Sequence, residues 1–206
     1  MEEVVPGVWR WTAKHPKIQV EVSSHWVPES GALIDPLLPP DDGFQPFRER
    51  PPDRILLSNR HHLRHAERFA EEFGCVIECS KPGLHEFEVG PEVRGFDFGD
   101  EVAPGIEALE VGAICPDETA LFIRSAGALV IADAIITYGG EMRFVSDYLL
   151  GDDPDLVKAN VRAAFARLLD RDFDNLLPAH GDPVIGGGKE ALRRFSEAGG
   201  NAGRPG

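Results

Sequence analysis

The chain has 206 residues, of which 42% are hydrophobic and 27% charged, as expected of one compact domain with a sizeable core. Its 35 acidic and 21 basic residues give a formal net charge of -14, which disfavours binding to nucleic acids or anionic membranes. No apolar run approaches the roughly 20 residues of a membrane helix, and the acidic N-terminus lacks the pattern of an export signal. We therefore expect a cytoplasmic protein that binds neither nucleic acid nor a membrane; the sequence does not indicate an oligomeric state.

The first half of the chain predicts a series of strands that leads into a β-α-β unit. Alternating or branched apolar runs indicate the strands, whereas Ala66, Phe69, Ala70 and Phe73 have helical spacing and Gly74 ends that helix. A stretch rich in Pro, Asp and Gly over 36–53 predicts a long surface loop. The predicted elements are strands over 4–11, 19–27, 31–35 and 54–57, a helix over 64–73 and a strand over 75–78.

The second half predicts more strands and two longer helices. The expected elements are short strands between 83 and 111, strands over 120–124, 128–132 and 175–179, and helices over about 154–170 and 189–198. Residues 201–206 are rich in Gly and Pro and are expected to be a disordered tail. Cys75, Cys79 and Cys115 are an odd number in a chain without an export signal, so we expect small buried hydrophobes rather than structural disulfides.

Four of the predicted strands end in polar residues of catalytic type. These are Asp35, a histidine-rich segment over 58–65, Asp133 and His180. Each one alone has a structural explanation, such as capping a turn. In layered α/β folds, however, loops at one edge of a sheet assemble sites from distant parts of the chain. Their joint occurrence predicts one site at that edge.

These residues resemble the motifs of the metallo-β-lactamase-fold superfamily, and the resemblance covers about residues 4–195. Leu33-Ile34-Asp35-Pro36 resembles the family's first Asp segment. The segment over 129–134 resembles the strand that ends in a metal-bridging Asp, and the segment over 177–183 resembles its late His-Gly. The resemblance implies an α/β (α+β) chain folded as a four-layer αββα sandwich, with a single such domain over 1–200.

Two other motifs depart from the family pattern. In the register of the family's His-x-His-x-Asp-His motif, Asn59 replaces the first His, His61 keeps the second, and Leu63 and Arg64 replace the Asp and the final His. In the next motif, Ile114 stands where a ligand His is expected. Too few ligands remain for the family's two-metal centre.

The resemblance implies metal-dependent hydrolysis of a small ester, thioester or phosphoester, if the chain is an enzyme. The residues that remain imply a degenerate site with at most one ion of zinc, iron or manganese. The ligands predicted in this register are His61, Asp133 and His180, with His65 as a fourth candidate and His62 as a weaker one. His61 and Asp133 are the predicted catalytic residues, and Asp35 is expected to orient its neighbours from behind the ligands.

Two metal-free interpretations remain open. In one, the guanidinium of Arg60 or Arg64 replaces the metal charge and, with Asn59, binds a carboxylate or phosphate of a ligand. In the other, the fold serves as a non-catalytic scaffold that binds a partner, and its polar residues satisfy each other. The fold alone does not choose between these classes of function.

Overall fold

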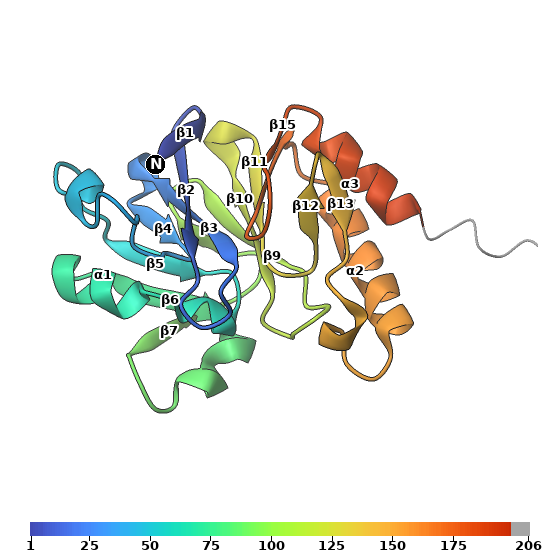
Figure 1. Ribbon diagram of the computed structural model, residues 1–206, viewed down its shortest axis with the longest axis horizontal. Helices are drawn as coiled ribbons and strands as arrows, with labels where there is room; N and C mark the ends of the chain where they lie inside the picture. The colour runs from blue at the N-terminus through green and yellow to red at the C-terminus, as the bar shows by residue number, and fades with distance from the viewer. Residues whose placement is uncertain (199–206) are drawn as a thin grey trace, which may run out of the picture.

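Two β-sheets face each other in this computed structural model, which describes residues 1–198 (Figure 1). The first sheet has seven strands in the order β1-β2-β3-β4-β5-β6-β7. Their bounds are β1 Glu2–Val5, β2 Val8–Lys14, β3 Glu21–Val27, β4 Ala32–Ile34, β5 Arg54–Leu57, β6 Val76–Ser80 and β7 Val93–Phe96. The predicted β-α-β unit is confirmed, because β5 and β6 are parallel neighbours and the helix α1 (Ala66–Phe73) joins them.

The second sheet has six strands in the order β15-β14-β11-β10-β9-β8. Their bounds are β8 Glu101–Ala103, β9 Ile106–Glu110, β10 Thr119–Ile123, β11 Ala128–Ile131, β14 Asn175–Pro178 and β15 Val184–Ile185. A separate hairpin pairs β12 (Ile136–Tyr138) with β13 (Glu141–Arg143).

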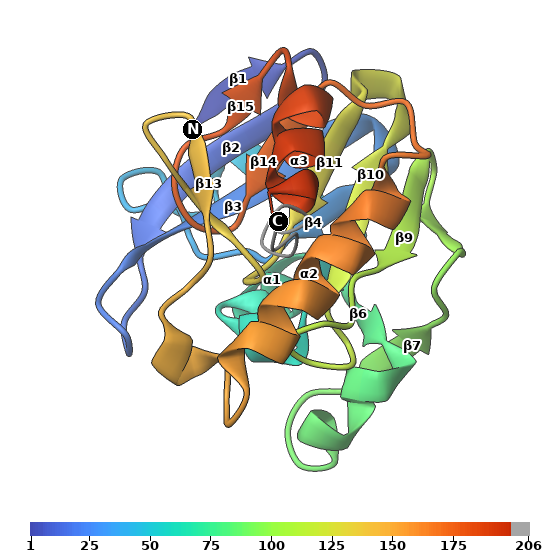
Figure 2. The ribbon, with the colours of Figure 1, turned by 90° about the vertical axis from the view of Figure 1, so that its right-hand side faces the viewer.

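The helices cover the outer faces of the sandwich, as the resemblance implied. The helix α1 lies against the first sheet, whereas α2 (Pro154–Leu168) and α3 (Gly188–Glu197) lie across the second (Figures 1 and 2). Three apolar clusters fill the spaces between these layers, one between the two sheets and one under each set of helices. The predicted four-layer αββα sandwich is therefore confirmed.

The alternation of side chains along β5 explains why this strand is apolar throughout. Ile55 and Leu57 point to the cluster under α1, whereas Leu56 points into the cluster between the sheets. Because both faces of the strand are buried, a continuous apolar run fits better than an alternating one. Phe47 completes the outer cluster and stacks edge-on against Phe69, with ring centroids 5.2 Å apart.

The strand ends that carry polar residues meet at one edge of the sandwich. β4, β5 and β6 are parallel in the first sheet, and β11 and β14 are parallel in the second. Backbone hydrogen bonds also join the two halves: the N–H of Thr119 donates to Ser58 O over 2.8 Å, and the N–H of Ser23 donates to Ala179 O over 2.8 Å.

Three expectations differ from the structure or lie outside it. The strand predicted over 4–11 is split into β1 and β2, because Pro6 and Gly7 form a turn in which Gly7 has φ +80°. The helix predicted from residue 64 begins at Ala66. The tail expected over 201–206 lies outside the described residues. The three cysteines are free and buried, as predicted, and among residues 1–198 no helix combines the length and apolar character needed to cross a bilayer.

Candidate metal centre

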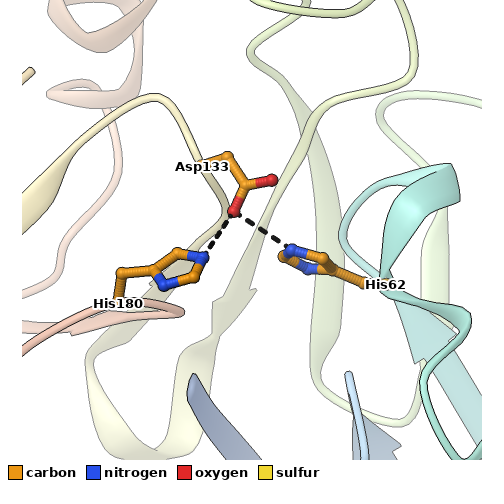
Figure 3. Close-up of side chains that lie close together, drawn as sticks. All are labelled: His62, Asp133 and His180. Carbon is orange, nitrogen blue, oxygen red and sulfur yellow. Dashed lines mark hydrogen bonds and ion pairs between the residues drawn. The ribbon is translucent and has the colours of Figure 1, made fainter. Parts of the chain in front are cut away.

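His62 belongs to a network of polar side chains, and Figure 3 shows Asp133 between the rings of His62 and His180. The Nδ1 of His62 is 2.9 Å from Asp35 Oδ2, and its Nε2 is 3.1 Å from Asp133 Oδ1. Its side chain is 6% exposed, so both ring nitrogens are bonded within the protein. Asp35 is buried as well, and one of its oxygens accepts the backbone N–H of Ser58 over 2.8 Å. The imidazole is therefore held in one orientation by a carboxylate behind it.

Asp133 joins His62 to a second histidine from the other sheet. The Nε2 of His180 lies 3.0 Å from Asp133 Oδ1, the same oxygen that faces His62. The other oxygen, Oδ2, accepts the side-chain amide of Asn59 over 3.0 Å. Asp133 follows β11 and His180 follows β14, so the parallel pairing of these strands brings the two residues together.

The charges of this network shift the pKa of both central groups. Burial alone would lower the pKa of His62, but the carboxylates of Asp133 and Asp35 outweigh it and raise the pKa to about 9. Burial would raise the pKa of Asp133, but His62 and a hydrogen bond from His180 hold it well below its usual value. Without a metal at neutral pH, the centre therefore contains a protonated His62 between two carboxylates.

The short 3₁₀ turn η3 (Arg60–Leu63) sets the position of His62. Asn59 caps this turn, because its Oδ1 accepts the backbone N–H of His61 over 2.8 Å. The next residue after the turn, Arg64, has φ +45°, and Asp35 opposite has φ +49°. Residues other than glycine rarely adopt a positive φ, and strained backbone of this kind is found most often at functional sites.

The glycine after His180 is required by the backbone of the neighbouring strand. Gly181 has φ +94°, and a Cβ at this position would lie 1.8 Å from Thr137 O. The backbone N–H of Thr137 donates to His180 O over 3.2 Å, which fixes the same segment from its other side. Only glycine fits there. The residue after His180 must therefore be glycine if the segment that carries His180 is to pack against Thr137.

The structure brings together two of the three predicted principal ligands and replaces the third. Asp133 and His180 are neighbours, but His62 rather than His61 stands beside them. His61 is exposed, and its backbone rather than its ring bonds to Asn59. The proposed fourth ligand, His65, lies elsewhere, since its Nδ1 accepts the N–H of Leu38 over 3.0 Å. The 3₁₀ turn causes the offset, because it rotates the ring of residue 62 toward the second sheet.

The residues considered for ligand binding are occupied by other contacts. The guanidinium of Arg60 forms an ion pair with the buried carboxylate of Asp117. Arg64 donates from Nη1 to the backbone oxygens of Ser23 and Asp35, over 2.6 and 2.7 Å. Asn59 is buried and bonds to Asp133, so none of the three replaces a metal inside the network. Asp35 contacts Nδ1 of His62, the ring nitrogen that does not face Asp133. This is the supporting position behind a ligand that the sequence analysis expected for Asp35.

The donor set fits one metal ion. His62, Asp133 and His180 each offer one ligand atom, and these atoms lie within 4.8 Å of one another. Ligands about 2.1 Å from a tetrahedral ion are about 3.4 Å apart, slightly more than the 3.0 and 3.1 Å found here. The carboxylate on the far nitrogen of His62 is the usual partner of a metal-binding histidine. A second ion has little support, because Asn59 already donates to Asp133 Oδ2.

Comparison with known proteins identifies the fold. No protein-family model matches the sequence, and no curated protein matches it closely enough to count as a relative. The metallo-β-lactamase DIM-1 superposes with a TM-score of 0.71 at 13% identity, covering 96% of this chain and 96% of that chain. The metallo-β-lactamase from Pontibacter korlensis gives 0.69 at 17%, covering 97% and 98%. TTHA1623 in a di-iron-bound form gives 0.62 at 18%, covering 90% and 92%. The chain therefore has the metallo-β-lactamase fold.

Proposed function

We propose that this protein is a single-metal hydrolase on the metallo-β-lactamase fold, with His62, Asp133 and His180 as the ligands of one zinc, iron or manganese ion. The observation that carries the proposal is the convergence of two histidine Nε2 atoms on Asp133 Oδ1. Two histidines and one carboxylate suit such ions and leave coordination positions open. A bound ion lowers the pKa of a coordinated water and polarises the bond that the water attacks.

Other residues of the protein orient the side chains that would bind the metal. Asp35 accepts the Nδ1 proton of His62 and so leaves Nε2 free for a metal. Asn59 fixes the plane of the Asp133 carboxylate through its Oδ2. The side chains of Asp133 and His180 are 32% and 20% exposed, so a substrate can approach the centre from that side. A small ester, thioester or phosphoester is the class of substrate that such a centre would hydrolyse.

The network also supports a second candidate function, a metal-free protein that binds a ligand on the same scaffold. The observation in its favour is that Asp35, His62 and Asp133 already satisfy one another by hydrogen bonds. In this case no metal is retained and no hydrolysis takes place.

Elemental analysis separates the two candidates. The full chain is purified without a chelator or metal-affinity tag and then dialysed against zinc, iron(II) or manganese. We expect about one ion per chain. The ion should be lost in His62→Ala and kept in His61→Ala, which removes the neighbouring but exposed ring. A chain that takes up no metal under any of these conditions would overturn the hydrolase proposal.

A further inference from the structure

Two consecutive acidic residues, Asp117 and Glu118, are buried where the two sheets meet, and each is only 1% exposed. They directly precede β10 of the second sheet, but residues of the first sheet hold their backbone. The hydroxyl of Ser80 donates to Asp117 O over 2.8 Å, and the N–H of Thr119 donates to Ser58 O over 2.8 Å. Burying a carboxylate is costly unless its oxygens accept hydrogen bonds, so the partners of these two side chains indicate what they do.

The side chain of Asp117 holds the turn that carries His62. Its Oδ2 accepts the backbone N–H of Arg60 over 2.6 Å, and its Oδ1 pairs with the guanidinium of the same residue. Arg60 is the first residue of η3, two positions before His62. The first N–H groups of a helical turn have no partner within the turn, so this carboxylate fixes where η3 begins.

The side chain of Glu118 holds the segment that carries Asp133. Its Oε1 accepts the backbone N–H of Ala134 over 2.7 Å, and its Oε2 accepts the N–H of Ile114 over a longer 3.4 Å. Ala134 directly follows Asp133, so the first bond fixes the peptide next to the predicted ligand. Burial and the charge of Asp133 raise the pKa of Glu118 to about 7, so its hydrogen bonds define its role more than a full negative charge does.

The two carboxylates therefore connect the two halves of the candidate centre. His62 follows the first sheet and Asp133 follows the second, and their contact of 3.1 Å crosses from one to the other. The hydrogen-bond ladders within each sheet do not set this separation. A path from Arg60 through Asp117 and Glu118 to Ala134 does link the two segments, and it consists of one peptide unit and two buried side chains.

We propose that Asp117 and Glu118 are positioning residues that set the separation between His62 and Asp133. A donor set that is already held at the right separation loses less free energy to reorganisation when it binds a ligand. The consequence for metal affinity rests on the proposed single-metal function, whereas the positioning of the two side chains does not.

The test compares two substitutions of Glu118 in the full chain. Glu118→Gln keeps the length of the side chain and an oxygen that accepts the N–H of Ala134. Glu118→Asp keeps the carboxylate but is one methylene shorter, so it withdraws the oxygen from that N–H. A positioning role predicts that Gln preserves the centre and Asp does not, whereas a role of the negative charge predicts the reverse.

The first readout is the pair of ring N–H proton signals of His62 in NMR spectra of the metal-free protein at pH 7. The proton on Nε2 donates to Asp133 across the sheets, whereas the proton on Nδ1 donates to Asp35 and serves as an internal reference. The second readout is zinc affinity by competition with a chelator. Glu118→Asp should move the Nε2 proton signal upfield, leave the Nδ1 signal in place and weaken zinc binding about tenfold.

Glu118→Gln should keep both signals, with zinc affinity within about twofold of the unmodified chain. The matched control is Glu110→Asp, which makes the same change at an exposed residue of β9 opposite Thr119 and should alter neither readout. The proposal is overturned if Glu118→Asp leaves the Nε2 signal in place, or if Glu118→Gln disturbs it as much as Glu118→Asp does.

A second variant covers the case in which Glu118→Asp does not fold. Asp117→Asn has one acceptor oxygen instead of two, so one of the two bonds to Arg60 is lost. The Nε2 signal of His62 should again move, and an unmoved signal would contradict the positioning role. An unmodified chain that binds no zinc would contradict the proposed hydrolase, but the proton signals would still decide whether the acidic pair positions His62 and Asp133.

Discussion

If His62 binds a metal, the affinity for that metal should depend steeply on pH. The carboxylates of Asp133 and Asp35 raise the pKa of His62 to about 9, so at neutral pH a metal must displace a proton. At pH 7, about two units below that pKa, the proton weakens the apparent affinity roughly 100-fold, or by ~2.7 kcal/mol. The dissociation constant should therefore fall about tenfold per unit between pH 7 and pH 9 and then level off.

Competition with a chelator of known affinity measures this dependence. Calorimetry in two buffers of different ionisation enthalpy should also show about one proton released per ion bound near pH 7.5. His61→Ala is the control and should keep the full dependence. An affinity that does not change between pH 7 and pH 9 would refute the assignment of His62 as a protonated ligand.

Four further predictions concern the fold and the centre, and each uses one substitution. Asp35→Asn should weaken metal binding about 10- to 100-fold in the chelator competition, because His62 loses the carboxylate that orients its ring; unchanged affinity would contradict this role. Asp117→Ala should lower the free energy of unfolding in urea by about 3 kcal/mol, because it leaves Arg60 without its buried partner; a loss below about 1 kcal/mol would show that water replaces the carboxylate. In the metal-free protein, the raised pKa of His62 stabilises the fold fully below about pH 6.5, and this stabilisation is lost as pH rises through 9; urea unfolding of His62→Gln should lack this loss. Phe47→Ala should cost about 3–5 kcal/mol by the same measurement, since the ring is fully buried.

Much of the fold was predictable because its signals are local. The apolar runs of β5 and β11 and the helical spacing of α1 follow from burial on one or both faces. Asp133 and His180 could be expected to meet because each directly follows a strand, and strand ends of one sheet share an edge.

The identity of the histidine at the centre was not predictable in the same way. Counting positions along a motif assumes that the backbone between them has the same form as in the family. Here Asn59 caps a 3₁₀ turn and Arg64 has a positive φ, so the backbone places residue 62 where the count placed residue 61. The capping type of Asn59 was the one local signal of that turn, and it does not by itself fix which ring points inward.

The centre draws its side chains from both halves of the sandwich. His62 follows a strand of the first sheet, whereas Asp133 and His180 follow strands of the second. An ion held by all three would therefore act as a cross-link between the halves, in addition to the backbone hydrogen bonds from Thr119 to Ser58 and from Ser23 to Ala179. At a free concentration of 100 times its dissociation constant, such an ion would add about 2.7 kcal/mol to the stability of the folded chain. Metal supply would then control how long the protein survives proteolysis, even when no substrate is present.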